Sequence, residues 1–291
     1  MERVIKRSGR RLFLATLLAV LASSVLLIGQ GQSGSRPQRL LFVGNSYTYF
    51  NNLPEMFAKL AEAGHRQVEA SMVAPGGWRL KDHWDKGDTL KIVREGRWDY
   101  VVLQEQSTLG VHVVVDGKPR VTSDGVFRPY ADKWAAEIRN AGATPVFYLT
   151  WARRLTPEDQ DVLNGAYVRA AKNNGALLVP VGIAWDQVRR QNPSIELFYA
   201  DGSHPSPAGT YLAACTFYGT IFDSNPAGLP GRIIGKPVNL LTGQVEPDKT
   251  AVLVDLPARD AKLLQSAAWS ACQKRGREVS LIHISEPTRP Y

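Results

Sequence analysis

The sequence predicts an α/β fold in which helices cover both faces of a parallel sheet. Short apolar runs of strand length alternate along the chain with segments of helical periodicity. The spacing of this alternation is typical of strand–helix–strand units. A length of 291 residues with 44% apolar content provides enough material for one sizeable domain, and no internal repeat is present.

The first half of the chain contains four of the five predicted strands. The first is the apolar run Leu40 to Val43, which Gly44 and Asn45 end, and the others are Val68 to Val73, Trp98 to Leu103 and Pro145 to Thr150. Helical periodicity predicts helices over Leu53 to Ala63, Thr89 to Glu95 and Phe127 to Asn140. Residues 108–125 form an insertion whose Val113 to Gly117 pattern predicts a hairpin over the site.

The second half continues the same alternation. A helix begins at Thr156, with Pro157 at its first position, and runs to about Asn173. The fifth strand is Ala176 to Val181. Further helices are expected over Ala184 to Gln191, Pro207 to Phe222 and about Ala258 to Arg275, with a loop rich in Gly and Pro before the last. We therefore expect one domain over residues 37–279.

The N-terminal residues 1–36 have the pattern of an export signal. Five basic residues and one acidic residue lie in the first eleven positions, ahead of the apolar run Leu12 to Ile28. That run suits either a cleaved signal or an uncleaved membrane anchor. A flexible linker, Gln30 to Arg36, follows. We expect the body of the protein to lie outside the cytoplasm: periplasmic, extracellular, or anchored to the outer face of the inner membrane.

Charge and cysteine content exclude or leave open other classes. Half of the +8 net charge comes from the N-terminal segment, and the rest forms no basic stripe, so we expect no nucleic-acid partner. Cys215 and Cys272 form either one disulfide or two buried thiols. No Cys or His cluster has ligand spacing, so we expect neither a metal nor a cofactor. Residues 280–291 resemble a translated sequencing adapter and are set aside as non-native.

Two segments contain the residue types of a hydrolytic site. Ser46 follows the first strand, where open α/β sheets bind ligands, and is the candidate nucleophile. The alternative is that Gly44-Asn45-Ser46 serves only turn and capping chemistry. Asp201 and His204 lie three residues apart in one turn, so the carboxylate can orient the imidazole as a general base. The alternative here is a capping Asp beside a surface His.

Together these segments resemble the SGNH (GDSL) hydrolase family, over about residues 39 to 222. Gly44-Asn45-Ser46-Tyr47-Thr48 resembles the first family block, with Asn45 in place of the usual Asp. Gly76-Gly77 resembles the second, and Asp201-Gly202-Ser203-His204 the last. The resemblance implies a three-layer α/β/α sandwich with a five-stranded parallel sheet, which is the flavodoxin-like SGNH hydrolase fold.

The resemblance also implies roles for individual residues. Ser46, His204 and Asp201 would form a catalytic triad, and the N–H groups of Ser46 and Gly77 would bind the oxyanion. The third block departs from the family pattern, since Gln104-Glu105-Gln106-Ser107 replaces Gly-x-Asn-Asp. Gln106 replaces the Asn by position, and Gln104 is the alternative donor.

Aromatic, basic and histidine side chains near the expected site have two interpretations each. Trp78, Trp84, Trp151 and Tyr47 are expected either to contact substrate or to pack, and Tyr49 is equally ambiguous. Arg153-Arg154 is either a feature of the pocket mouth that favours an acidic polymer or a solvated charge pair. His65, His83 and His112 are expected at the surface.

These observations favour an exported serine esterase. We expect it to hydrolyse short-chain esters, with acetyl groups on carbohydrate as the substrate hypothesis and small esters as the simplest partners. One alternative is a lipase or thioesterase with the same triad. Another is a catalytically silent carbohydrate- or envelope-binding protein of the same fold, because the third block is altered.

Overall fold

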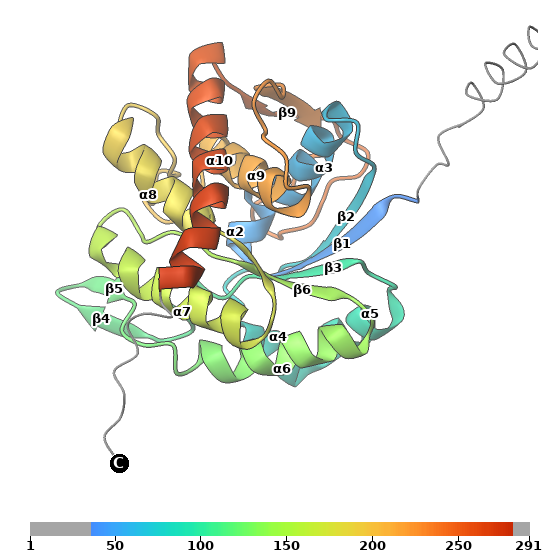
Figure 1. Ribbon diagram of the computed structural model, residues 1–291, viewed down its shortest axis with the longest axis vertical. Helices are drawn as coiled ribbons and strands as arrows, with labels where there is room; N and C mark the ends of the chain where they lie inside the picture. Colours follow the sequence, from blue (N-terminus) through green and yellow to red (C-terminus); the bar gives the residue numbers. More distant parts are fainter. Residues whose placement is uncertain (1–35, 282–291) are drawn as a thin grey trace, which may run out of the picture. The chain divides into compact units, whose positions relative to one another are not determined.

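The structure, a computed structural model, describes residues 36–281. Residues 37–281 fold around a central five-stranded parallel sheet (Figure 1). The strand order is β2-β1-β3-β6-β7, and every neighbouring pair is parallel. The strands are β1 (Gln38–Val43), β2 (Val68–Val73), β3 (Tyr100–Leu103), β6 (Thr144–Tyr148) and β7 (Leu177–Val179). The predicted fold class and all five predicted strands are confirmed.

Both faces of the sheet are apolar, which explains why the strands read as continuous hydrophobic runs. Successive side chains point to opposite faces of a strand. In β1, Leu40 and Phe42 therefore enter one core, and Leu41 and Val43 enter the other. All four side chains are at most 1% exposed, so β1 is buried on both sides.

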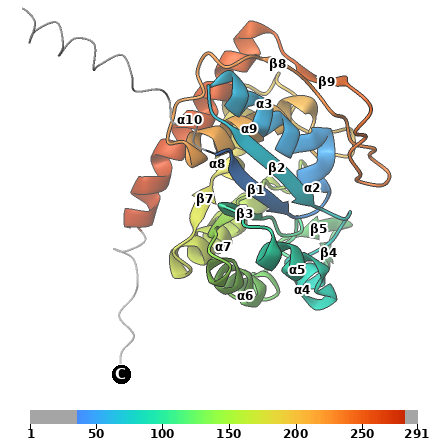
Figure 2. The ribbon, with the colours of Figure 1, turned by 90° about the vertical axis from the view of Figure 1, so that its right-hand side faces the viewer.

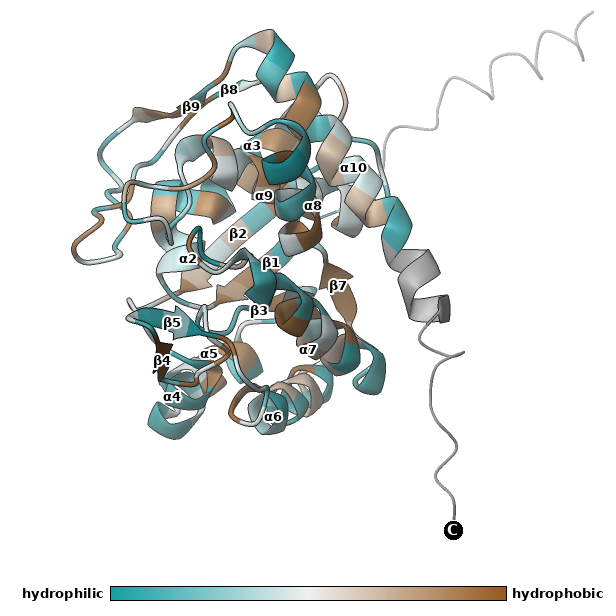
Figure 3. Cartoon of the chain, turned by 90° about the vertical axis from the view of Figure 1, so that its left-hand side faces the viewer, coloured by the Kyte–Doolittle hydropathy of each residue, from teal (hydrophilic) through white to brown (hydrophobic). Residues whose placement is uncertain are grey.

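Helices cover both faces of the sheet (Figure 1). One layer consists of α3 (Leu53–Ala63), α8 (Val181–Gln191), α9 (Pro207–Ile221) and α10 (Ala258–Leu281). The other consists of α4 (Leu80–Lys86), α5 (Asp88–Glu95), α6 (Phe127–Asn140) and α7 (Gln160–Asn173). Figure 3 shows hydrophilic and hydrophobic residues mixed along α6 and α7, as expected for helices with one buried face.

The helix α9 differs from the others because it is apolar all round. Every residue from Gly209 to Ile221 is buried, since α9 packs between α3 and α10 as well as against the sheet. A helix that is hydrophobic on all sides belongs in a core. This packing fixes the direction in which α9 begins, and the turn immediately before α9 contains Asp201 and His204.

Two predicted connections contain more structure than expected. The expected Gly- and Pro-rich loop before α10 includes an antiparallel pair, β8 (Arg232–Gly235) and β9 (Ala251–Asp255), which lies near α3 (Figure 2). The helix α4 was also not predicted. It begins at a capping box between Arg79 and Asp82, and Gly87 ends it in the left-handed conformation.

Several other expectations concern the termini and cysteines. Cys215 and Cys272 are two buried thiols in the structure, not a disulfide. Among residues 36–281, no helix is both long and apolar enough to cross a membrane. The expected export segment, Leu12 to Ile28, and residues 282–291 of the expected non-native tail lie outside the described residues.

Candidate active site

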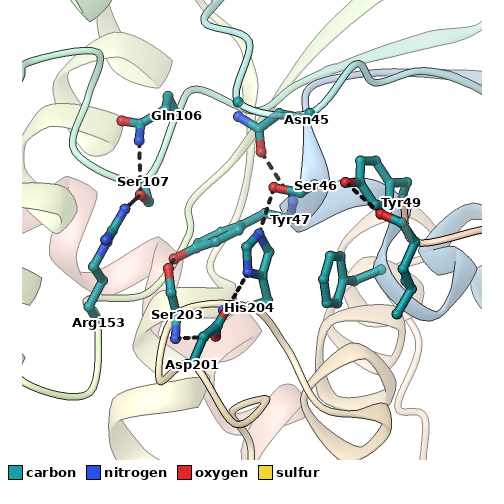
Figure 4. A pocket seen from close by; sticks show the side chains of 14 residues that line it. Asn45, Ser46, Tyr47, Tyr49, Gln106, Ser107, Arg153, Asp201, Ser203 and His204 are labelled. Carbon is teal, nitrogen blue, oxygen red and sulfur yellow. Dashed lines mark hydrogen bonds and ion pairs between the residues drawn. The ribbon is translucent and has the colours of Figure 1, made fainter. Parts of the chain in front are cut away.

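A cavity of about 410 Å³ opens at the carboxyl edge of the sheet, where the loops after β1, β2, β3 and β6 meet the turn before α9. Figure 4 shows its side chains converging on Ser46 and His204. The lining includes the expected residues Ser46, Tyr47, Gly77, Gln106, Asp201 and His204. It also includes several others: Asn45, Tyr49, Phe50, Gly76, Ser107, Arg153, Ser203 and Leu240.

Ser46 is the first residue of the short helix α2 (Ser46–Tyr49), directly after β1. The capping role belongs to Asn45, whose Oδ1 accepts a hydrogen bond from Tyr47 N at 3.1 Å. Asn45 Nδ2 also donates to Trp78 O at 2.8 Å, which joins this turn to the loop after β2. The Ser46 hydroxyl is thus not used for capping and lies at the cavity.

Asp201, His204 and Ser46 form a continuous chain of hydrogen bonds. His204 Nε2 lies 2.8 Å from Ser46 Oγ, and His204 Nδ1 lies 2.5 Å from Asp201 Oδ2. The other carboxylate oxygen, Asp201 Oδ1, accepts from Ser203 N at 2.9 Å and from His204 N at 3.0 Å. Residues 158 positions apart therefore meet in the geometry that a nucleophile, a base and an orienting carboxylate require.

Contacts around this turn keep Asp201 ionised and fix the orientation of the His204 ring. Burial raises the pKa of Asp201, but the hydrogen bonds from His204 and from two backbone N–H groups outweigh it, so the pKa lies below its ordinary value. Asp201 is thus ionised at neutral pH. Phe50 stacks on the His204 ring with centroids 4.2 Å apart, and Tyr47 meets the ring edge-on at 5.6 Å.

Three candidate oxyanion donors line the cavity. The backbone N–H groups of Ser46 and Gly77 donate to no acceptor within residues 36–281. Gly77 has a φ of +74°, a left-handed conformation that favours glycine. The Oε1 atom of Gln106 accepts from Thr108 N at 2.8 Å, which fixes the orientation of the amide. The Nε2 atom on the other side of the amide donates to Ser107 Oγ at 3.2 Å.

Gln104, the alternative oxyanion donor, does not reach the cavity, so that expectation is wrong. Its side chain is fully buried under the Ser46 turn. Gln104 Oε1 accepts from Asn45 N and from Thr48 Oγ1, both at 2.9 Å, while Nε2 donates to Asn45 Oδ1 at 3.0 Å. Both the oxygen and the nitrogen of the Gln104 side-chain amide therefore form hydrogen bonds that hold the Ser46 turn. A Cβ at Gly44 would lie 2.5 Å from Gln104 Oε1, so this packing requires glycine there.

Glu105 is a residue that the sequence interpretation did not single out. It is fully buried, and its carboxyl oxygens accept from Gln106 N at 2.7 Å and from Leu80 N at 3.3 Å. These contacts join the loops that present Gln106 and Gly77. Burial raises the pKa of Glu105 to about 8, against the opposing effect of the two N–H donors. A buried, titratable carboxyl group thus joins the backbone of Gln106 to Leu80, three residues after Gly77.

His83 was expected at the surface and is instead fully buried, so that expectation is wrong. Its Nε2 lies 2.8 Å from Gly44 O and its Nδ1 3.0 Å from Thr89 Oγ1. A carbonyl oxygen only accepts, so Nε2 carries the proton and Nδ1 accepts from the threonine. Burial lowers the pKa of His83, which is consistent with this neutral form. His65 and His112 are exposed, as expected.

The tryptophans do not form a substrate platform. Trp151 is fully buried, stacked between Tyr47 at 4.7 Å and Trp185 at 3.8 Å, so its expected contact with substrate is wrong. Its Nε1 instead donates to Ser203 O at 3.0 Å, which positions the turn of His204. Trp78 is half-buried beside His83 and is not part of the cavity lining. Trp84 packs edge-on against Trp134.

Tyr47 is 3% exposed and combines the two roles considered for it, because one part of the ring packs on Trp151 while the residue also borders the cavity. The predicted hairpin, β4 (Val113–Val115) and β5 (Lys118–Arg120), is confirmed, but its residues do not line the cavity. Arg120 of this hairpin instead pairs with Asp159 at 2.8 Å.

The two arginines after β6 separate in the structure. Arg153 lines the cavity, whereas Arg154 pairs with Glu196 at 2.8 Å outside it. Within residues 36–281, no group of three or more His, Cys, Asp or Glu side chains is placed to hold a metal ion. The cavity therefore presents a nucleophile with its base, candidate oxyanion donors and one guanidinium.

Comparison with known proteins places this fold and site in context. No protein-family model and no curated protein matches the sequence. A protein from Slackia heliotrinireducens described as an SGNH hydrolase is 31% identical with a TM-score of 0.53, over 64% of this chain and 100% of that one.

Two further solved structures are more distant. A DUF4886 family protein from Bacteroides uniformis is 17% identical with a TM-score of 0.58, over 87% of this chain and 97% of that one. An acetyl xylan esterase, AlAXEase, is 16% identical with a TM-score of 0.52, over 63% of this chain and 99% of that one. At these identities the likeness is one of fold.

Proposed function

The chain belongs to the SGNH hydrolase family of serine ester hydrolases, and from this premise we propose that it is an exported esterase that removes short acyl groups, with acetyl on carbohydrate as the substrate. The observation that carries the proposal is the hydrogen-bonded chain from Ser46 through His204 to Asp201 at the cavity. Export is proposed from the basic residues and apolar run of the first 28 positions.

The proposed reaction proceeds through an acyl-enzyme. Ser46 Oγ attacks the ester carbonyl carbon while His204 Nε2 takes the hydroxyl proton, and Asp201 stabilises the imidazolium that forms. The tetrahedral intermediate collapses, and the alcohol leaves with the proton from His204. Water, activated by the same nitrogen, then attacks the acyl-enzyme and releases the acid.

The oxyanion of each tetrahedral intermediate would be stabilised by N–H donors at the cavity. The backbone N–H groups of Ser46 and Gly77 are the first two donors, and Gln106 Nε2 is the proposed third. Removing one such donor typically lowers the rate by about 10² to 10³. The change from the family Asn to Gln106 alters the length of the side chain and not the type of donor.

A short acyl group is supported by the size and lining of the cavity. A volume of about 410 Å³ is at the small end for ligand sites. Its apolar surface comes from Tyr49 and its neighbours Phe50 and Leu240, whereas the remaining lining is mostly polar. Trp151 is buried and Trp78 lies outside the cavity lining, so neither supports carbohydrate binding. The carbohydrate part of the proposal rests on the proposed export and on the polar lining of the cavity.

A chain-length series tests this function. With 4-nitrophenyl esters from acetate to laurate, we expect kcat/KM to be highest at two to four carbons and to fall by about tenfold or more by eight carbons, because the longer chain exceeds the apolar side of the cavity. Acetate release from acetylated xylan tests the carbohydrate part. Turnover of long-chain esters alone would instead indicate a lipase or thioesterase, and hydrolysis of no ester would indicate a silent binding protein.

A further inference from the structure

Arg153 is a cation at the cavity that has no carboxylate partner among the residues that the structure describes. Its Nη2 donates to Ser107 Oγ at 2.8 Å, and its Nε is buried without an acceptor. Among residues 36–281, no Asp or Glu oxygen lies within ion-pair distance of its guanidinium. Buried or half-buried guanidinium groups are normally paired, because removing an uncompensated charge from water is costly.

Neighbouring charges do not compensate Arg153. Arg154, the next residue, pairs with Glu196 at 2.8 Å and lies over the Phe198 ring at 5.0 Å. The carboxylate at the cavity, Asp201, is engaged by His204 and by two backbone N–H groups. One positive charge at the cavity therefore remains available to a ligand.

We propose that Arg153 binds a carboxylate of the substrate, so that the natural ester carries an acidic group close to its scissile bond. This inference rests on the proposed esterase function and specifies its substrate class, for example an acetylated uronic acid. Figure 4 shows Arg153 and Ser107 on one side of Ser46, with Tyr49 on the other. The substrate would thus lie across Ser46 with its acidic end toward Arg153.

The chemistry of the guanidinium favours a carboxylate over a neutral hydroxyl. An arginine binds a carboxylate through two parallel N–H donors, and such charge-assisted pairs are about twice as strong as neutral hydrogen bonds. Among residues 36–281, Nη1 of Arg153 has no acceptor and, unlike Nε, is not buried, so Nη1 and Nη2 are the donors that remain for such a pair. Ser107 Oγ holds the group through Nη2, which restricts its orientation before substrate arrives.

A pair of matched esters tests the inference: 3-acetoxybenzoate, which carries a carboxylate, and its neutral methyl ester. We expect wild-type protein to prefer the acid, and Arg153→Gln to lower the ratio of the two kcat/KM values on the order of 10- to 100-fold through KM. Arg153→Lys should keep part of the preference. Arg154→Gln removes a neighbouring charge outside the cavity and should keep the wild-type ratio.

Binding without turnover separates this inference from the proposed function. In Ser46→Ala protein, calorimetry should show 3-acetoxybenzoate binding that weakens on the order of 10-fold or more when Arg153→Gln is added. A purely structural Arg153 would lower activity on both esters equally and leave this affinity unchanged, which would overturn the inference. Arg153-dependent binding by a protein that hydrolyses no ester would support the anion site and overturn the esterase.

Discussion

Replacing Ser46 with alanine is expected to lower kcat for 4-nitrophenyl acetate by about 10⁴-fold or more, because the atom that forms the acyl-enzyme is removed. Asp201→Asn should lower kcat by about 10³ to 10⁴-fold, since the amide no longer stabilises the imidazolium. Both effects should appear in kcat, with KM changing little. Steady-state kinetics with folding checked by circular dichroism measures them.

The matched control is Ser71→Ala on β2, where the serine is exposed. It should retain wild-type kcat. We also expect strong non-additivity: the Ser46→Ala and Asp201→Asn double variant should be about as slow as Ser46→Ala alone, because both residues act in one step. Retention of more than a hundredth of wild-type kcat by Ser46→Ala would rule out this serine as the nucleophile.

The second large effect is a dependence of stability on pH that comes from Glu105. Its pKa is about 8 in the folded protein against an ordinary value of 4.5. Between these values the unfolded chain loses the proton and the folded protein keeps it, so the free energy of unfolding falls as pH rises. At about 1.4 kcal/mol per pH unit, Glu105 alone should contribute a loss of about 5 kcal/mol, complete above pH 8.

The groups around Glu105 set this behaviour. Arg79 lowers its pKa and Asp82 raises it, while the hydroxyl of Tyr167 accepts a hydrogen bond from Glu105 N at 3.1 Å. The pKa values of Asp82 and Tyr167 are shifted down and up, respectively, so neither changes charge between pH 5 and 9. Glu105 is therefore the group of this cluster that titrates in that interval.

Glu105→Gln isolates the effect because it resembles the protonated carboxyl group in shape. Urea unfolding between pH 5 and 9 should show the variant losing less stability than wild type as pH rises, with the difference reaching about 4 kcal/mol over this interval. Glu62→Gln, which removes an exposed carboxylate, should retain the wild-type decline. Parallel curves for wild type and Glu105→Gln would contradict the assignment.

The fold could be predicted from the sequence because its strands are buried on both faces. Runs such as Leu40 to Val43 leave little ambiguity in a parallel sheet, and the helix over Leu53 to Ala63 has the boundaries that its periodicity and Gly64 predict. The pair β8 and β9 could not be predicted in this way. Its strands are separated by a polar loop, and a register shift lies between Ile233 and Ile234.

The candidate site was predictable where local sequence determines the role. Ser46 follows a strand, and the Asp201 to His204 spacing closes a turn by itself. Whether Gln104 or Gln106 reaches the cavity depends on where β3 ends, and a change of one residue moves a side chain to the opposite face. The burial of Trp151 depends on Trp185, a stacking partner from a helix far along the chain.

The sequence could not predict which charged side chains near the cavity would have a partner of opposite charge. Arg153 and Arg154 are adjacent and identical in type, yet one pairs with Glu196 and the other faces the cavity. The Glu105 carboxyl is buried because loops from β2 and β3 close over it. Such differences arise from contacts between distant segments, which no local pattern encodes.

The central claim is that Ser46 and His204 share a proton at this cavity and make the serine nucleophilic. Labelling with a fluorophosphonate, followed by mass spectrometry of the peptides, tests it most directly. We expect one adduct, on Ser46, that forms rapidly in wild type, far more slowly in His204→Ala, and not at all in Ser46→Ala. An adduct on another serine, or equal labelling of wild type and His204→Ala, would contradict it.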